Sequence, residues 1–256
     1  MQFTSYTPLS LKPLALIALG LLTATVQAEQ TNPAQKYNAP TRGFFIEQGT
    51  VNGAGKASVE LHTGNHMDQG GGIRLGLPRA ELIINSGFGD DDENELLVKW
   101  GMRKVNPNND GKSVLNWAVL GGISHLDVDD DEGNPNTDFD RTSLKLGAAV
   151  TIAADAGTFT ISPMAVYADD DDRRDADDTF FELGLGGYVG VIDTQSGLFS
   201  LGLEAILTSE DDTDNTVAFG GRWSYNSRVN LDFVPIILSD EDTVGIPGLV
   251  RLNMVF

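Results

Sequence analysis

Histidine is the side chain best suited to acid–base chemistry at neutral pH, and this sequence of 256 residues contains three. His125 follows Ser124 and precedes Asp127 by two positions, the one grouping in which a nucleophile could have a base beside it. Adjacent residues of a β-strand point to opposite faces, so Ser124 and His125 are not expected to meet. His62 and His66, near Asp68, could form a site at the rim, but three such residues within one loop are a common coincidence. The sequence contains no zinc-binding motif, nucleophile elbow or phosphate-binding loop. We therefore expect no enzymatic activity.

Acidic residues are concentrated in short runs, and one run has the spacing of a set of metal ligands. Asp127, Asp129 and Asp131 match positions 1, 3 and 5 of a calcium-binding loop, with Asp138 at position 12. Glu132 stands where that loop requires glycine, and position 12 is normally glutamate, so the match fails. We expect no cofactor and at most weak binding of Ca²⁺ or Mg²⁺. A solvated, self-repelling loop is the favoured interpretation.

The first residues have the pattern of a cleaved export signal. Lys12 precedes an apolar run, Leu14–Val26, which closes on Val-Gln-Ala at 26–28. The run is too short for a membrane-spanning helix, which needs about 20 apolar residues. Residues 1–28 are therefore predicted to be a signal peptide. Because the chain has no cysteine, neither a lipid-modified cysteine nor a disulfide is expected.

The elements that must position these residues are predicted to be strands. From Lys56 onwards, apolar residues alternate with small or polar ones in segments bounded by turn residues. The formal net charge of −20 argues against nucleic acid as a partner. The predicted strands are 56–64, 70–77, 80–88, 95–105, 113–126, 140–152, 158–168, 179–192, 198–208, 216–225, 229–238 and 246–256.

Connections between these segments are of two kinds that alternate along the chain. One kind is short, such as 78–79 and 226–228, and the other is acidic, such as 90–93, 127–138 and 169–178. Bacterial membrane barrels have short turns on one side, longer loops on the other and an even number of strands. The sequence therefore predicts an all-β fold: a transmembrane, antiparallel, up-and-down β-barrel of twelve strands over residues 56–256.

Three prolines fall inside the predicted strands. Pro163, Pro235 and Pro247 each remove a hydrogen bond from the strand ladder. We expect bulges or local distortion at these positions.

The last segment, LVRLNMVF, shows two different faces. Val250, Leu252, Met254 and Phe256 alternate with other residues and are predicted to face lipid. A C-terminal strand of this kind, with the signal peptide and the alternating segments, resembles the porin-like outer-membrane β-barrel proteins of Gram-negative bacteria. The resemblance implies that these four residues form the signal read by the barrel-insertion machinery. It also implies export to the periplasm, a place in the outer membrane, and contact with outer-membrane lipid and lipopolysaccharide.

Residues 29–55 precede the predicted barrel, and they do not fit its even number of strands. Gly43–Val51 reads as a further strand, which would make the number odd and would place the N-terminus outside. Residues 29–55 are therefore predicted to form either a periplasmic arm or a segment that enters the lumen.

The inward face of the predicted strands carries charges of both signs. Because many of its other residues are small, a barrel of this size is predicted to leave a narrow path, and the protein to be a passive channel for ions or small hydrophilic solutes. The same charges could instead pair as buried salt bridges and fill the lumen. The residues predicted to line the lumen are Lys56, Glu60, Arg74, Glu81, Lys99, Arg103, Lys145, Glu182, Glu204, Arg222, Asp232 and Arg251.

A second function remains open from the sequence. A non-conducting surface barrel would bind divalent cations, lipopolysaccharide or a partner through its acidic extracellular loops. Neutralising Arg222 or Arg251 would shift the ion selectivity of a channel. Deleting 127–138 or 169–178 would change binding by a surface protein.

Overall fold

The computed structural model describes residues 41–64, 69–88, 91–102, 113–128, 139–154, 157–170, 179–210, 214–225, 228–239 and 248–256. Within these ranges no helix is long and apolar enough to cross a membrane. The strands are β1 (Ala57–Thr63), β2 (Gln69–Leu77), β3 (Ala80–Phe88), β4 (Asp91–Gly101), β5 (Ser113–Val128), β6 (Phe139–Ala154), β7 (Gly157–Asp170), β8 (Thr179–Asp193), β9 (Gly197–Thr208), β10 (Thr216–Tyr225), β11 (Val229–Leu238) and β12 (Leu249–Val255).

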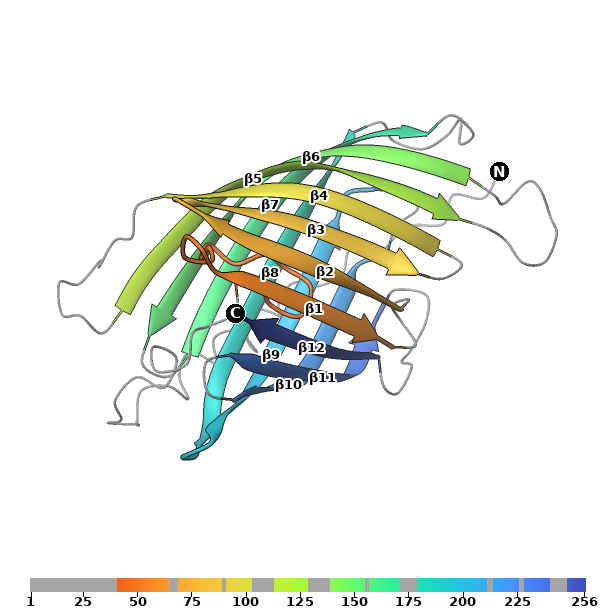
Figure 1. Cartoon of the computed structure of the whole chain (residues 1–256). Coiled ribbons are helices and arrows are strands. Elements are labelled where there is room, and N and C mark those ends of the chain that lie inside the picture. Colours follow the sequence, from red (N-terminus) through yellow and green to blue (C-terminus); the bar gives the residue numbers. More distant parts are fainter. Residues whose placement is uncertain are drawn as a thin grey trace.

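These strands form one closed barrel in which each strand pairs with its neighbours in the chain and β12 returns to β1 (Figure 1). The closing pair is antiparallel, with Ser58 opposite Val255 and Thr63 opposite Val250. The last residue continues the ladder, because Phe256 N donates a hydrogen bond of 2.8 Å to Ala57 O. The predicted all-β, antiparallel barrel of twelve strands is confirmed.

The strand ends differ from the predicted ends where a long neighbour extends the ladder. β4 begins at Asp91, where it pairs with Val128 of β5, and only residues 89–90 connect it to β3. The prediction that residues 90–93 form an acidic loop was therefore wrong for 91–93. Backbone hydrogen bonding to β5 decides the conformation here, although aspartate disfavours strands.

Two of the three prolines lie at interruptions of the ladder. Between β6 and β7 the pairing passes from Gly147 and Met164 directly to Val150 and Ile161, which leaves Pro163 out. Between β10 and β11 the register shifts by one residue around Pro235. Proline has no N–H to donate, so both interruptions occur where the ladder lacks a donor. Pro247 lies outside the described residues.

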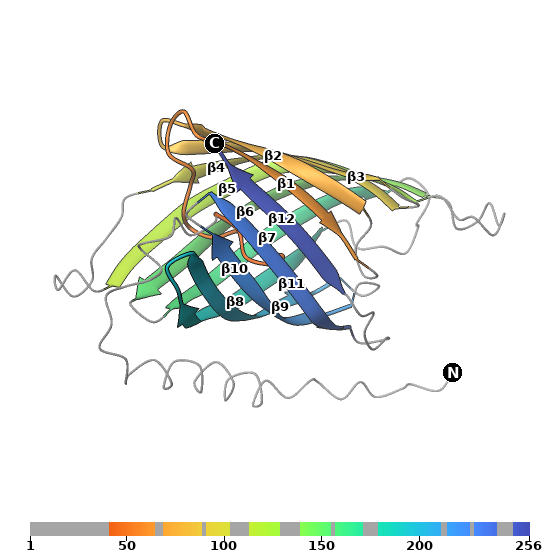
Figure 2. The same cartoon turned by 60° about the horizontal axis from the view of Figure 1, so that its bottom comes forward.

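The barrel has two rims, which we name by their connections. The turn rim is where β1 begins and β12 ends, and it carries the connections 78–79, 102–112, 155–156, 194–196 and 226–228. The opposite rim is the loop rim. Figure 2 shows the C-terminus and the start of β1 together at the turn rim.

Outward positions between the two rims are apolar. Leu144, Leu146 and Phe181 are 57%, 63% and 64% exposed, whereas the inward Ile83 is fully buried. Alternate residues of each strand thus belong to an apolar exterior and to an interior with many charges.

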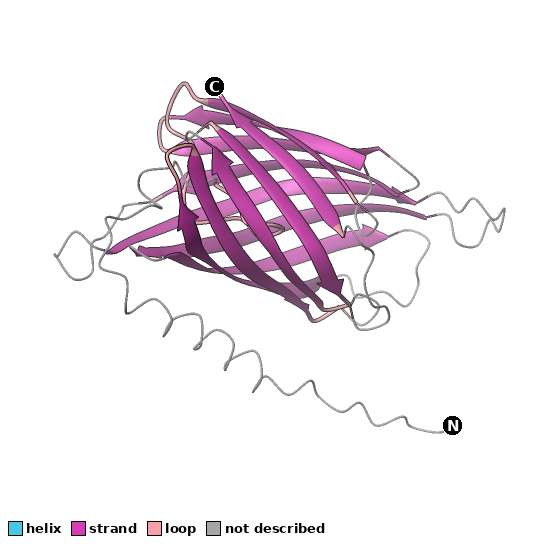
Figure 3. Cartoon of the chain, turned by 90° about the horizontal axis from the view of Figure 1, so that it is seen from below, coloured by secondary structure: helices cyan, strands magenta, loops and turns pink. Residues whose placement is uncertain are grey.

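Residues 41–52, which we call the inner segment, lie inside the barrel and do not form a strand (Figure 3). The segment folds back on itself through an isolated bridge between Arg42 and Glu47 and a hydrogen bond of 2.8 Å from Gly43 N to Ile46 O. Its Phe44 is fully buried. The alternation of Gly43–Val51 does not produce a strand, because a closed barrel offers no free edge for pairing. Residues 29–40 lie outside the described part of the chain.

Candidate functional site

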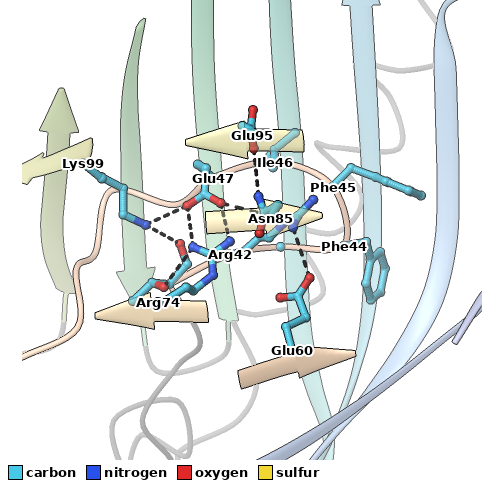
Figure 4. Close-up of polar contacts among 12 residues, drawn as sticks. Arg42, Phe44, Phe45, Ile46, Glu47, Glu60, Arg74, Asn85, Glu95 and Lys99 are labelled. Atoms are coloured by element: carbon cyan, nitrogen blue, oxygen red, sulfur yellow. Dashed lines mark hydrogen bonds and ion pairs between the residues drawn. The ribbon is translucent and has the colours of Figure 1, made fainter. Parts of the chain in front are cut away.

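The carboxylate of Glu47 is held by two cations of the barrel wall (Figure 4). Arg74 of β2 donates from Nη2 to Oε1 at 2.6 Å and from Nη1 to Oε2 at 3.0 Å, which is a bidentate pair. Lys99 Nζ of β4 donates to Oε2 at 2.7 Å. Burial alone would raise the pKa of Glu47, but the charges of Arg74 and Lys99 hold this pKa well below its ordinary value. Glu47 is therefore an anion at neutral pH.

A second acidic residue, Glu81, pairs with Lys99, one of the two cations that hold Glu47. Glu81 of β3 stands directly opposite Lys99 in the register, and their side chains form an ion pair of 2.9 Å. Thr41 Oγ1 and Asn52 Nδ2, at the two ends of the inner segment, donate to Glu81 Oε1 at 2.9 and 2.8 Å. Both ends of the inner segment are thereby attached to one residue of the wall.

Glu204 of β9 binds the backbone of the inner segment. Its carboxylate accepts hydrogen bonds from the three successive N–H groups of residues 44–46, at 2.7, 2.7 and 3.2 Å. It also accepts one from the Tyr188 hydroxyl. Gly43 makes this approach possible, because a Cβ at that position would overlap Glu204 Oε1.

Three charged residues lie in a row across β10, β11 and β12, and the two arginines among them donate to carbonyls of the inner segment. Asp232 stands opposite Arg222 on one side and Arg251 on the other. Arg222 Nε donates to Asp232 Oδ1 at 2.6 Å, and Arg251 Nη2 to Oδ2 at 3.0 Å. Both arginines also donate to Gly43 O, at 3.1 and 2.7 Å. Every charge in this row therefore has a counter-charge or a backbone partner.

Apolar contacts accompany these polar ones. The rings of Phe44 and Tyr188 meet edge to face with their centres 5.0 Å apart, and the Arg222 guanidinium lies over the Tyr188 ring at 4.9 Å. Ile46 packs where Gly184 of β8 leaves space, since a Cβ there would lie 3.2 Å from Ile46 Cβ. The inner segment therefore fits the wall in shape as well as in charge.

The half of the interior near the loop rim has its own ion pairs. Lys145 Nζ lies 2.9 Å from Glu95 Oε1 and 3.1 Å from Glu93 Oε1. Arg141 pairs with Glu210 at 2.6 Å and covers the ring of Phe180 at 5.0 Å. Side chains thus occupy this half of the lumen too.

A cavity of about 340 Å³ remains near the turn rim. It lies between the inner segment and the wall, and its lining is rich in cations. The lining includes Arg42, Asn52, Lys56, Asn116, Asn230 and Arg251.

The residues predicted to line the lumen are distributed as follows. Lys56 is exposed and precedes β1 at the turn rim, and Arg103 lies outside the described residues. The insertion-signal residues Val250, Leu252 and Met254 are half-buried on the outside, and Phe256 is exposed. The other residues predicted to line the lumen face inward and are buried or half-buried: Glu60, Arg74, Glu81, Lys99, Lys145, Glu182, Glu204, Arg222, Asp232 and Arg251.

The residues considered for metal binding and catalysis are not assembled into a site in the described structure. Asp127 is exposed in β5, opposite Asp140, and Asp129, Asp131 and Asp138 lie outside the described residues. Among the residues that can be described, no three His, Asp or Glu side chains are placed to hold a metal ion. Ser124 is buried and its neighbour His125 is exposed, so the two point to opposite faces.

Sequence reasoning missed the partners that the inner segment supplies. Arg42 and Glu47 were not considered as interior charges, nor was Tyr188 as the neighbour of Glu204. A signal was present: Glu47 directly follows the apolar run Gly-Phe-Phe-Ile at 43–46, and an acid that is buried together with such a run needs a cation as a partner.

No family model and no curated protein matches this chain. Among solved structures, the chain is similar to one described as "Bacterial polysaccharide outer membrane secretin", with 8% sequence identity and a TM-score of 0.35. The similarity covers 81% of this chain and 99% of that one.

Proposed function

We propose that the protein spans the outer membrane of a Gram-negative bacterium as a channel for ions or small hydrophilic solutes, and that the inner segment closes this channel at rest. One observation carries the proposal: the segment that fills the lumen is separate from the wall and is attached mainly through polar groups. A wall that carries Arg74, Lys99, Glu204 and Arg222 can be hydrated when the segment leaves, whereas an apolar wall could not.

The exterior supports the membrane part of the proposal. The outward row of β6 is Leu144, Leu146, Ala148, Val150 and Ile152, and it has no charge. A lysine or arginine at the middle of such a row would cost about 2–4 kcal/mol in lipid. Exposed aromatics such as Phe88, Tyr167, Trp223 and Tyr225 lie near the strand ends, where membrane barrels carry their aromatic girdles. The lipid contacts, the insertion signal and the location belong to this proposal.

The packed interior favours one alternative. The ion pairs of both halves could close the lumen permanently, and the protein would then be a non-conducting surface barrel that binds through its loops. We propose enzymatic activity for neither form.

A reversible lock between the inner segment and the wall separates the two functions. The double variant Ile46→Cys, Gly184→Cys places its two Cβ atoms about 3.2 Å apart, close to the separation in disulfides, and the native chain has no cysteine to interfere. The variant is studied in a planar bilayer, first oxidised and then after addition of a reductant. We expect conductance steps only after reduction.

The control is the double variant Ile46→Ser, Gly184→Ser, which cannot be locked and should conduct whether or not reductant is present. Equal conductance of the oxidised and reduced cysteine variant would show that the inner segment does not gate the path. Silence of every form, including a chain that lacks residues 41–52 and has a folded β spectrum, would support the non-conducting barrel.

A further inference from the structure

Residues 42–47 occupy the lumen as a bound peptide would. The wall binds four kinds of group on them: the Glu47 side-chain carboxylate, the Arg42 guanidinium, the N–H groups of residues 44–46, and the carbonyls of Arg42 and Gly43. The N–H groups and carbonyls are backbone groups that any peptide has, and the guanidinium pairs with Glu60 of β1 at 3.1 Å. The wall is therefore complementary to a peptide that carries one carboxylate, and it also has an acid for a cation five residues before that carboxylate.

The charges of the wall are incomplete without this occupant. Arg74 has Glu47 as its bidentate partner, and Lys99 is shared between Glu47 and Glu81. On the other side of the lumen, Glu204 has the N–H groups of 44–46 and Tyr188 as its described partners, with no cation among them. Departure of the inner segment leaves Arg74 without its anion on one wall, and on another wall it leaves Glu204 without the three N–H groups, with Tyr188 as its remaining described donor. Both need new partners, because an unpaired charge in a narrow lumen is unfavourable.

Resting on the proposed function, we infer that the lumen contains a binding site for short peptides with an acidic side chain, and that residues 42–47 are its tethered occupant. The acidic side chain of the ligand binds Arg74 and Lys99, and its backbone N–H groups bind Glu204. A ligand that takes both positions displaces the inner segment and opens the path.

The apolar surroundings add a preference for an aromatic residue before the acidic one. Phe44 lies three residues before Glu47, and its ring is buried against Tyr188 and beside Gly202. A peptide with an aromatic residue three positions before a glutamate therefore fits both pockets at once. The cavity of about 340 Å³ near the turn rim gives such a ligand room beside the inner segment, within the usual size of small-molecule pockets.

The probe for this site is the peptide Arg-Gly-Phe-Phe-Ile-Glu with an uncharged fluorophore on its N-terminus and an amide at its C-terminus, so that it has one carboxylate. Its partner probe ends in Gln instead of Glu. Binding of each fluorescent peptide is measured by anisotropy on the refolded full mature chain with Glu47→Gln, whose own occupant lacks the carboxylate. We expect the Glu peptide to bind about tenfold more tightly or better, as for the loss of a charged hydrogen bond.

Two wall variants show whether the discrimination comes from the proposed pair. Arg74→Met, added to the Glu47→Gln chain, removes the bidentate partner of the carboxylate and should remove most of the difference between the two peptides. Arg74→Lys keeps the charge and should preserve part of the difference. Equal binding of both peptides to the Glu47→Gln chain would overturn the inference, and so would a difference that is undiminished in Arg74→Met.

Conductance separates this inference from the proposed function. Addition of the Glu peptide to the wild-type channel should raise its open probability, and the Gln peptide should do so far less. A channel that opens on reduction of the cysteine lock but does not distinguish the peptides would refute the peptide site and leave the channel intact. Discriminating binding in a barrel that never conducts would refute the channel and leave the site intact.

Discussion

Gly43 is the residue on which the position of the inner segment depends most. Its missing side chain lets the carboxylate of Glu204 reach three N–H groups, and that carboxylate cannot turn aside without losing them. We expect Gly43→Ala to weaken the attachment by roughly 1–3 kcal/mol, the cost of unsatisfied buried polar groups, and to raise the open probability in a planar bilayer. Gly53→Ala is the matched control, since a Cβ there meets nothing closer than 3.8 Å. Similar behaviour of both variants would contradict this role.

In the proposed channel, Glu47 should set how the closed state depends on pH. A carboxylate whose pKa is lowered on folding stabilises the folded form above its unfolded pKa, and this contribution disappears as the pH falls through the lowered value. The ordinary pKa of glutamate is about 4.3, so the Glu47 contact should be complete at any pH above about 5. Channel closure by this contact is therefore expected to be constant from pH about 5 to 8. A conductance that rises steadily on acidification within that window would be inconsistent with this assignment.

Removing the negative charge of Glu47 tests how much its ion pairs stabilise the folded barrel. Glu47→Gln leaves Arg74 buried without its anion, and breaking a buried pair in this way costs roughly 3–5 kcal/mol. Glu93→Gln, which removes a half-exposed partner of Lys145, should cost less than about 1 kcal/mol. The two free energies of unfolding, measured in guanidinium with the barrels in lipid, should differ accordingly. A loss for Glu47→Gln no larger than that for Glu93→Gln would argue against a tightly held carboxylate.

At the scale of elements, the sequence predicts the strands well and the inner segment poorly, for a physical reason. Alternation has a period of two wherever one face is apolar, so β6, β9 and β12 could be located from their residues alone. Residues 43–51 alternate as well, but the barrel closes without them and no edge remains for pairing. Whether an alternating segment becomes a strand depends on a free partner, which is a property of the whole sheet.

The turn between β2 and β3 offers a prediction at this scale. Arg79 follows a proline there and has a φ of 66°, a backbone conformation that favours glycine. Arg79→Gly should therefore stabilise the barrel by roughly 0.5–1 kcal/mol, measured as the free energy of unfolding in guanidinium. Arg79→Lys keeps both the Cβ and the charge and should change nothing. An equal gain from the lysine variant would point to the guanidinium rather than to the backbone.

For the whole molecule, the sequence identifies which residues face the interior but not whether the interior is open. The alternation places Arg222, Asp232 and Arg251 on one face, and the register then brings them side by side. Whether these charges bind water or the chain itself depends on residues 41–52, whose position no local pattern determines. A lumen lined with charges is thus compatible with a channel and with a closed barrel, and the difference lies in one short segment.

The charge of the whole lumen leads to the last prediction. The described interior wall carries two more acidic than basic side chains, with the excess near the loop rim, so the opened channel should prefer cations. The charges counted are Arg74, Lys99, Arg141, Lys145, Arg222 and Arg251 against Glu60, Glu81, Glu93, Glu95, Glu182, Glu204, Glu210 and Asp232.

The reversal potential of the reduced cysteine variant under a salt gradient measures this preference. Lys145→Gln should strengthen it and Glu93→Gln should weaken it, because both side chains belong to the acidic half. The preference should fade towards 1 M salt, where the screening length falls to about 3 Å, shorter than the width of any path through the lumen. A reversal potential of anion sign would mean that the cations around Glu47, once uncovered, govern the passage of ions. The narrowest part of the path would then lie at Arg74 and Lys99 and not at the loop rim.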